Sequence, residues 1–381
     1  MRIRKGILGI DIGFAGTKAC FSEEFGKKVV VEFPSATADP TEGGIETGDV
    51  QREIVHVQDD EERTLLSLMF GETAQKLGDD ATPDLSANMY YGLNGGLSLH
   101  YVGLLCAGIA KAKEQLIPNN GEEWEIVVGL GCAISHYNLD LAHNIYQGLV
   151  NHPMIISLEG QKPFKVTITH LIFESQPLWA ICSQMLRFNG KPAQDKSWLN
   201  DPVVFDIGSL TSHIVPFVCL PGKNGRKELT AKRPHTGKGM WSLEDPVREL
   251  LRDKGLQQFE RGLSPWDIMQ ILRSGKFRSL DLSEDLQGLY DRKARQVIAD
   301  AGKTIGDGAK AGRVLLVGGG QYRLASYLRH RYHDMTETGL LEMIDAIDEE
   351  GHIAYVEAVA LGAWLGARIY LWSRQTQAQV K

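Results

Sequence analysis

An aspartate followed by a glycine-containing turn occurs twice in this chain of 381 residues, each time between two apolar runs. In residues 203–215 an apolar run ends in Asp206-Ile207-Gly208, passes through small and hydroxylated residues, and then resumes. This pattern predicts a hairpin between two buried strands. Because glycine carries no Cβ, the backbone can approach a ligand closely there, and the N–H groups of Ser209, Leu210 and Thr211 can point at a phosphate. Asp206, at the end of its strand, is placed to hold a hydrated Mg²⁺.

The same arrangement appears near the N-terminus, in residues 7–20. Apolar residues lead into Asp11-Ile12-Gly13, small residues follow, and Lys18 precedes a further apolar pair. For either aspartate alone, a turn-capping role after a strand explains the pattern better than metal binding does. Two copies in the same strand–turn–strand frame, far apart in the chain, instead suggest two similar domains that face one another across a nucleotide.

The composition is that of an ordinary globular protein. Its length suggests two or three domains, and 43% hydrophobic residues suffice for their cores. The net charge of −7 does not favour direct nucleic-acid binding. The cysteines occur singly in apolar surroundings, which predicts buried thiols in a reducing cytoplasm rather than disulfides or a metal clamp. They are Cys20, Cys106, Cys132, Cys182 and Cys219.

We expect neither a secretory signal nor a membrane span. The apolar run near the N-terminus is interrupted by Asp11 within a few residues. The only candidate span, residues 354–372, contains Glu357 and Arg368 and is broken up by two glycines. This composition favours a buried, closely packed C-terminal helix.

Strand and helix patterns are mixed along the chain, which predicts an α/β protein. Residues 35–60 have a loop-rich composition with one short strand at 53–57, and the segment 223–232 is polar. The other predicted strands are 7–10, 18–22, 27–33, 124–131, 164–173 and 313–317, besides the hairpin at 203–215. The predicted helices are 65–77, 97–115, 140–148, 178–187, 242–254, 265–272, 284–305 and 324–330.

The order of four motifs resembles that of the actin superfamily of nucleotide-dependent ATPases. These motifs are the hairpin ending in Lys18, a strand followed by Glu174 and a helix, the second hairpin, and a strand followed by Gly318-Gly319-Gly320 and a helix. Within the superfamily the chain is most similar to plasmid-segregation actins of the ParM group. Residues 173–177 resemble the Pro-Glu-Ser-x-Pro step of that group, with Phe173 in place of the first proline. Residues 314–320 resemble its adenosine turn, and 356–365 resemble its closing helix.

The resemblance implies a two-domain actin-like fold, in which a ribonuclease H-like unit is duplicated and a nucleotide cleft lies between the domains. Domain I would comprise residues 1–173 and 353–381, with an outer subdomain at about 34–96. Domain II would comprise residues 174–352, with an outer subdomain at about 233–311.

The resemblance also implies site residues for ATP, or for GTP as the alternative, with Mg²⁺. Asp11 and Asp206 would position the metal, mostly through water, and Glu174 would orient or deprotonate the attacking water. The nucleotide-binding residues would be Gly13, Phe14, Ala15, Gly16 and Lys18 in the first hairpin, Gly208, Ser209, Leu210 and Thr211 in the second, and Gly318, Gly319, Gly320 and Gln321 in the glycine turn. Phe14 replaces a small hydroxyl residue and Ser209 replaces a glycine of the family pattern, so backbone N–H groups would do most of the binding at both turns.

The function implied is an ATPase whose hydrolysis is coupled to head-to-tail polymerisation in the cytoplasm, and which moves plasmid DNA through an adaptor protein. Direct contact with nucleic acid or membrane is not expected. A small-molecule kinase and a non-polymerising adaptor ATPase of the same superfamily are the alternatives. Individually, Glu174 also suits a helix start and the glycine triplet a tight packing turn. We interpret His100, His136 and His170 as structural or surface residues, and 323–333 as a solvated helix face.

Overall fold

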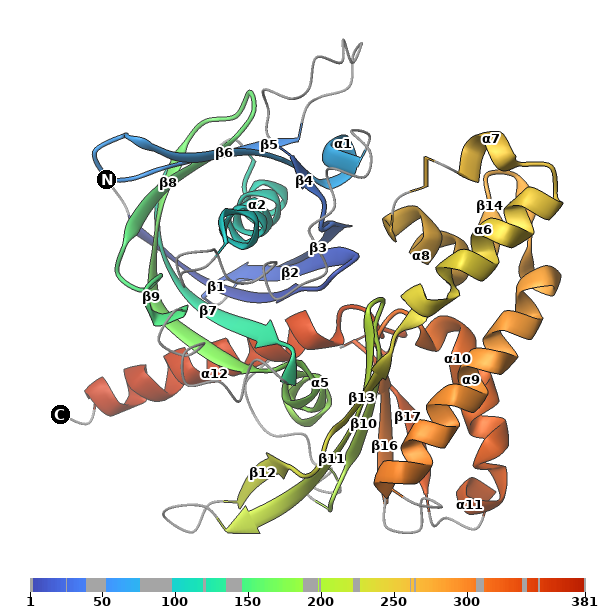
Figure 1. Ribbon diagram of the computed structural model, residues 1–381. Coiled ribbons are helices and arrows are strands. Elements are labelled where there is room, and N and C mark those ends of the chain that lie inside the picture. Colours follow the sequence, from blue (N-terminus) through green and yellow to red (C-terminus); the bar gives the residue numbers. More distant parts are fainter. Residues whose placement is uncertain are drawn as a thin grey trace. The chain divides into compact units, whose positions relative to one another are not determined.

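The chain divides into two compact units in the computed structural model, drawn in Figure 1. Unit 1 is Met1–Trp179 with Val359–Lys381, and unit 2 is Ala180–Ala358. The domain limits expected from the sequence, 173/174 and 352/353, stay a prediction.

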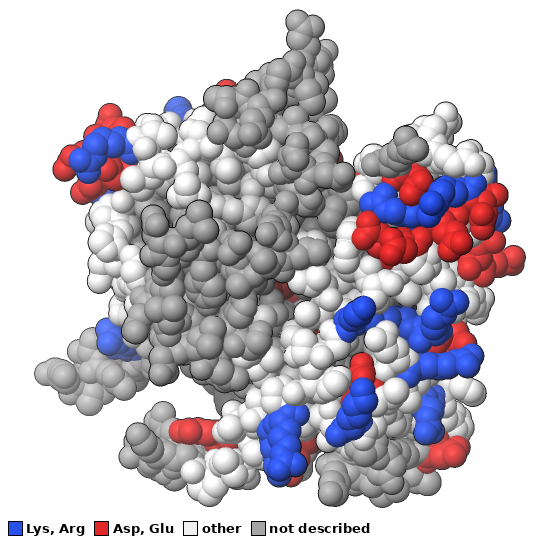
Figure 2. Space-filling view, viewed as in Figure 1, with Lys and Arg blue, Asp and Glu red and all other residues white. Residues whose placement is uncertain are grey.

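In Figure 2, groups of side chains of both charge signs lie side by side on the surface of the described residues. The structure describes residues 3–24, 26–38, 53–75, 98–118, 121–134, 146–187, 198, 200–221, 227–260, 262–263, 265–305, 312–337, 341–348 and 350–379.

Unit 1 contains a nine-stranded sheet in the order β3-β2-β1-β7-β9-β8-β5-β6-β4. Strand β1 is antiparallel to β2 and parallel to β7, and β7 is parallel to β9. The bounds are β1 Ile3–Ile12, β2 Gly16–Glu23, β3 Lys28–Pro34, β4 Thr37–Ala38, β5 Ile54–Gln58, β6 Thr64–Phe70, β7 Glu123–Cys132, β8 Pro153–Leu158 and β9 Phe164–Ser175.

Helices cover both faces of this sheet, which is why β1 and β7 are apolar along most of their length. Helix α2 (Leu99–Leu116) lies on one face and the closing helix α12 (Ala358–Gln379) on the other. A Cβ at Gly9 would lie 2.1 Å from the Ala360 carbonyl oxygen, so α12 approaches β1 more closely than any other residue type allows. The predicted buried C-terminal helix is confirmed. Among the described helices, none combines the length and apolar character that crossing a membrane requires.

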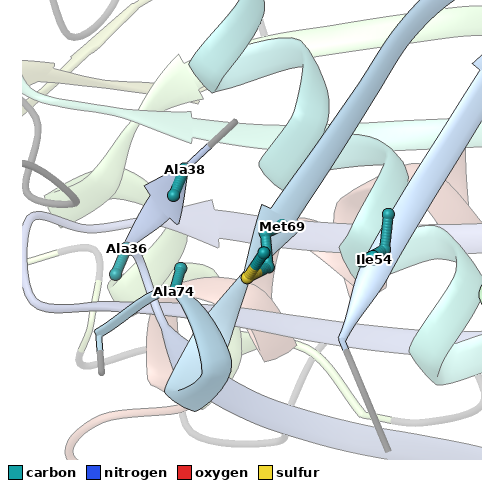
Figure 3. Packing of buried hydrophobic residues seen from close by; sticks show 5 residues of the cluster. All are labelled: Ala36, Ala38, Ile54, Met69 and Ala74. Carbon is teal, nitrogen blue, oxygen red and sulfur yellow. The ribbon is translucent and has the colours of Figure 1, made fainter. Parts of the chain in front are cut away.

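The helix predicted at 65–77 is wrong. Most of this stretch is strand β6, which pairs antiparallel with β5, and only Gly71–Gln75 form a short helix, α1. Short apolar runs suit a strand or a buried helix equally well, and here pairing with β5 decides. The sheet curls around α2, as Figure 1 shows. A small core beside α1, seen in Figure 3, consists of Ala36, Ala38, Ile54, Met69 and Ala74.

Unit 2 repeats the central strand arrangement of unit 1. Strand β10 is antiparallel to β11 and parallel to β16, and β16 is parallel to β17. The order is β12-β11-β10-β16-β17, with β13 also paired to β11. The bounds are β10 Val203–Ile207, β11 Thr211–Pro221, β12 Lys227–Ala231, β13 His235–Lys238, β16 Arg313–Val317 and β17 Glu342–Asp345. Strand β12, which was not predicted, lies in the polar segment 223–232 and pairs antiparallel with β11.

The helices of unit 2 follow the sequence prediction closely. Helix α9 (Ser283–Ile305) lies against β11 and β13, and α10 (Gln321–Arg331) follows β16. Shorter elements complete the unit: η5 Met240–Leu243, α6 Glu244–Asp253, α7 Gln257–Glu260, α8 Pro265–Ser274, β14 Lys276–Phe277, β15 Leu280–Asp281 and α11 His333–Glu337. Helix α5 (Gln176–Met185) connects the units. The helix predicted at 140–148 lies mostly outside the described residues.

Candidate functional site

The first turn, residues 13–16, connects β1 and β2. It is closed by a hydrogen bond from the Gly13 N–H to the Gly16 carbonyl, 3.1 Å, and Lys18 Nζ donates to the same carbonyl at 2.9 Å. The Ser35 N–H holds the Ala15 carbonyl at 3.2 Å. Because the carbonyl and N–H of a trans peptide point in opposite directions, this contact directs the Gly16 N–H away from Ser35. Phe14 is buried, so the turn presents backbone rather than a side-chain hydroxyl.

Asp11 lies at the end of β1 beside this turn and is only 6% exposed. Its Oδ1 accepts a hydrogen bond from Gln176 Nε2 at 2.7 Å, and its Oδ2 lies 4.0 Å from Lys18 Nζ. Burial raises the pKa of Asp11, while the Lys18 charge and the Gln176 hydrogen bond oppose that rise. Gln176 was not identified as a site residue from the sequence, although it lies two residues after Glu174.

Glu174 and Asp11 lie on opposite sides of the same β7 residue. The register pairs Asp11 with Gly131 and Gly131 with Glu174. Two strand spacings therefore separate the two carboxylate residues, roughly 10 Å between Cα atoms. Burial raises the pKa of the neighbouring Cys132 thiol, and the charges of Glu174 and Asp11 raise it further. Asp11 and Glu174 therefore lie near the same end of the sheet, where both affect the pKa of Cys132.

The second turn, residues 208–211, repeats the geometry of the first. The Gly208 N–H donates to the Thr211 carbonyl at 2.9 Å, as Gly13 does to Gly16. Asp206, 8% exposed, holds the same place before this turn that Asp11 holds before the first.

Residues 239–241, which we call the strap, bind the second turn from one side. The N–H groups of Gly239, Met240 and Trp241 donate to the carbonyls of Leu210, Gly208 and Ser209 at 2.7, 3.0 and 2.7 Å. With three successive carbonyls held by the strap, the N–H groups of residues 209–211 are directed away from it. Successive N–H groups that point to one side form an anion-binding concavity. The strap lies about thirty residues beyond the turn, and no motif in the sequence indicated it.

His213 occupies the place in the second hairpin that Lys18 occupies in the first. It pairs with Asp206, as Lys18 pairs with Asp11. Its Nε2 and Nδ1 hydrogen-bond the hydroxyls of Thr211 and Thr236 at 2.9 and 3.0 Å. Burial lowers the pKa of His213 to about 4, so the imidazole is neutral near pH 7. His213 was missed from the sequence, although both residues follow their aspartate by seven positions.

The glycine turn, residues 318–320, lies against Asp206 and the strap within unit 2. Gly318 has φ +87, and a Cβ there would lie 2.7 Å from Asp206 Oδ1. A Cβ at Gly320 would lie 2.9 Å from Met240 Cγ, so neither glycine leaves room for a side chain. Gln321 is 1% exposed, and its Nε2 donates to the Phe205 carbonyl at 3.0 Å. The Gln321 side chain therefore ties the glycine turn to β10.

The aspartate at either turn offers the carboxylate oxygens that a hydrated Mg²⁺ accepts as ligands beside phosphates and water. Within the described parts of the chain, the group whose potential ligand atoms lie within 4.8 Å of one another is Asp348, Glu350 and His352. There Asp348 Oδ1 accepts the N–H groups of Glu350 and His352, which is the pattern of a capped turn. A metal at Asp11 or Asp206 would accordingly need oxygens from a ligand and from water.

No protein-family model matches the chain, and no curated protein matches its sequence. Solved structures match nearly its whole length. ParM of Bacillus thuringiensis with ATP superposes with a TM-score of 0.68 at 16% identity, covering 97% of this chain and 99% of that one. A ParM filament from Clostridium botulinum gives 0.64 at 19% identity over 96% and 99%, and an archaeal actin homologue gives 0.61 at 18% over 95% and 98%. The chain has an actin-like fold.

The actin-like fold confirms the predicted α/β class and the predicted resemblance to ParM-type structures. It also explains the repeated strand order, since both sheets carry an Asp-x-Gly hairpin at the same place. The roles assigned to individual residues from the sequence stay predictions.

Proposed function

We propose that this protein is a nucleotide-dependent, filament-forming ATPase that segregates plasmid DNA through an adaptor protein. The observation that carries the proposal is the strap, which holds three carbonyls of the second turn and directs the N–H groups of residues 209–211 to one side. Structures with the same fold support it. ParM of Bacillus thuringiensis is described with ATP and with AMPPNP, and ParM of Clostridium botulinum as a 15-stranded filament.

In the proposal both turns contribute groups that bind the phosphates of the nucleotide. The first turn contributes backbone N–H groups and the Lys18 ammonium to the β- and γ-phosphates of ATP, or of GTP as the alternative. The second turn contributes the N–H groups of residues 209–211. Asp11 and Asp206 would position Mg²⁺, mostly through water, and the metal would neutralise part of the phosphate charge. The glycine turn lets the adenosine lie against the backbone.

Hydrolysis depends on Glu174. Its carboxylate is half-buried at the end of β9, two strands from Asp11. A carboxylate within hydrogen-bond reach of the attacking water orients it and accepts its proton. Glu174 has this role in the proposal.

Assembly follows from the placement of the turns on different units. A triphosphate bound by both would favour one arrangement of the units over others. That arrangement presents matching head-to-tail surfaces, and hydrolysis weakens the filament. The protein acts in the cytoplasm, and an adaptor rather than the acidic chain itself contacts DNA.

Sedimentation of the purified chain tests the proposal. We expect a pellet with Mg²⁺ and ATP or AMPPNP, a smaller pellet with ADP, and dispersal of the ATP pellet as phosphate is released. Absence of assembly with AMPPNP at high protein concentration would contradict the filament. Phosphate release without assembly would then favour the adaptor ATPase, and phosphate transfer to a small molecule the kinase.

A matched pair of lysine variants separates nucleotide binding from general charge effects. Lys18→Met removes the ammonium beside Asp11, whereas Lys27→Met removes an exposed one between β2 and β3. Loss of a charged hydrogen bond predicts that the Kd for AMPPNP rises roughly tenfold to a hundredfold in Lys18→Met. Lys27→Met should bind and assemble like the parent chain. Equal behaviour of the two variants would remove Lys18 from the site.

A further inference from the structure

Lys293, in the middle of α9, is a buried lysine that the proposed function leaves unused. It is 2% exposed, unlike the lysines and arginines on the surface in Figure 2. Removing an ammonium from water is costly unless its N–H donors are all satisfied. Lys293 Nζ donates to the Lys238 carbonyl, to Ser242 Oγ at 3.2 Å and to Gln296 Oε1 at 3.2 Å. Each of the three N–H donors of the Lys293 ammonium can therefore be paired with an acceptor.

The environment of Lys293 does not favour its charge. Its pKa is lowered to about 8, mainly by burial; the nearby Asp300 charge opposes this shift and the Lys238 charge adds to it. Asp300 itself lies 2.8 Å from Lys303 Nζ and 3.2 Å from His235 Nε2. An apolar side chain of similar length would fill this place without the desolvation cost. A lysine here therefore calls for an explanation other than packing.

The acceptors of Lys293 lie at both ends of the strap. Lys238 immediately precedes residues 239–241 and Ser242 immediately follows them. Ser242 Oγ also donates to the Gly239 carbonyl at 2.7 Å, and Ser212 Oγ donates to the Lys238 carbonyl at 3.0 Å. One ammonium on α9 thus anchors both ends of the segment that holds the second turn.

We propose that Lys293 is a positioning residue for the second phosphate turn. Through the strap it keeps the N–H groups of residues 209–211 aligned, and so raises affinity for the phosphates of the nucleotide without touching them. That the ligand is a nucleotide rests on the proposed function, whereas the anchoring of the strap by Lys293 does not.

Lys293→Met, which keeps length and removes the donors, is the test. The matched control is Lys113→Met, which removes a lysine that is 1% exposed on α2 of unit 1. Affinities for AMPPNP with Mg²⁺ and for adenosine are measured by calorimetry. We expect the AMPPNP Kd to rise about tenfold in Lys293→Met with the adenosine Kd unchanged, and both to stay unchanged in Lys113→Met. An equal loss for both ligands, or none, would overturn the proposal.

Hydrogen exchange of the nucleotide-free chain tests the anchoring separately. In Lys293→Met the amides of the strap should exchange faster, while those of β16 keep their protection. Unchanged protection of the strap would overturn the proposal even where nucleotide affinity falls. If the parent chain binds no AMPPNP, the proposed function fails while exchange still decides the anchoring. Should Lys293→Met not fold, Ser242→Ala removes one acceptor of Lys293 together with the hydrogen bond from Ser242 to the Gly239 carbonyl. It should also accelerate exchange of the strap amides, and unchanged protection would again overturn the proposal.

Discussion

Lys18 and His213 hold the same register position in the two units, each paired across a hairpin with the aspartate that precedes a glycine turn. Their chemistry differs. Lys18 places an ammonium 4.0 Å from Asp11, whereas His213 is a buried neutral imidazole bonded to Thr211. The duplicated hairpins are therefore not equivalent. At this register position unit 1 carries a cation, Lys18. Unit 2 carries a neutral imidazole, His213, which holds the hydroxyl of Thr211.

The burial of His213 predicts a loss of stability in acid. Folded His213 titrates near pH 4, whereas its ordinary pKa is 6.5, so the unfolded chain takes up the proton first. The contribution to stability is full above pH 6.5 and is lost as the pH falls towards 4. We expect His213→Gln to flatten the pH dependence of the free energy of unfolding over this window, by on the order of 2 kcal/mol.

Denaturant unfolding at several pH values checks the His213 prediction. His100, in unit 1, also has a pKa lowered by burial to about 4. The parent chain and His213→Gln both retain His100, so the difference between them isolates His213. Parallel pH curves for the two proteins would contradict the prediction.

Gly239 is predicted to tolerate no side chain. A Cβ there would lie 2.4 Å from the Ser209 carbonyl oxygen and 2.6 Å from Thr211 N, so Gly239→Ala must push the strap off the second turn. Overpacking of this kind costs about 1–3 kcal/mol, and AMPPNP affinity should fall with it. Gly288→Ala on α9 is the control, since nothing lies within 4 Å of its Cβ and alanine favours a helix by about 1 kcal/mol. Thermal unfolding and calorimetry should show lower stability and weaker AMPPNP binding in Gly239→Ala than in Gly288→Ala. Similar results for both variants would contradict the close contact between Gly239 and the second turn.

Glu174→Gln should slow hydrolysis and spare binding. The amide keeps the shape of the side chain but accepts no proton, and loss of a general base typically lowers kcat about a hundredfold or more. Phosphate release is the measurement, with AMPPNP affinity and AMPPNP-dependent sedimentation expected to stay unchanged. Glu159→Gln, at an exposed carboxylate bonded to His56, serves as control. Undiminished phosphate release in Glu174→Gln would exclude Glu174 from the mechanism.

Gln176 is predicted to oppose the rise in the pKa of Asp11 that burial causes. Its hydrogen bond lowers the pKa of Asp11 against the effect of burial, so Gln176→Leu should raise that pKa further. Since Mg²⁺ requires the carboxylate, binding of AMPPNP with Mg²⁺ should begin to fail at a higher pH than in the parent chain. Calorimetry between pH 5 and 8, a range set by the ordinary titration of buried carboxylates, measures this shift. Gln184→Leu on the same helix, where the amide bonds the Ile347 carbonyl, should leave the profile unchanged. An unshifted profile for Gln176→Leu would contradict the prediction.

Local patterns in the sequence predicted much of the scaffold. Both hairpins, strands β7 and β9 and helices α2 and α9 were expected, because runs of apolar residues with a clear period have one favourable local structure. The apolar residues of 65–77 fit a helix or a strand. Most of this stretch forms strand β6 because it pairs with β5. Strand β12 likewise depends on β11, since its polar sequence has no strand pattern of its own.

The sequence by itself determined where the acidic turns lie, because an aspartate and a glycine that interrupt an apolar run predict the end of a buried element there. Only the tertiary structure decided which groups support each turn. Gln176 reaches Asp11 across 165 positions in the chain. The strap holds the second turn from a separate segment, and Lys293 on α9 contacts the ends of the strap. Such contacts depend on how strands and helices pack, and packing brings together residues that no local pattern relates.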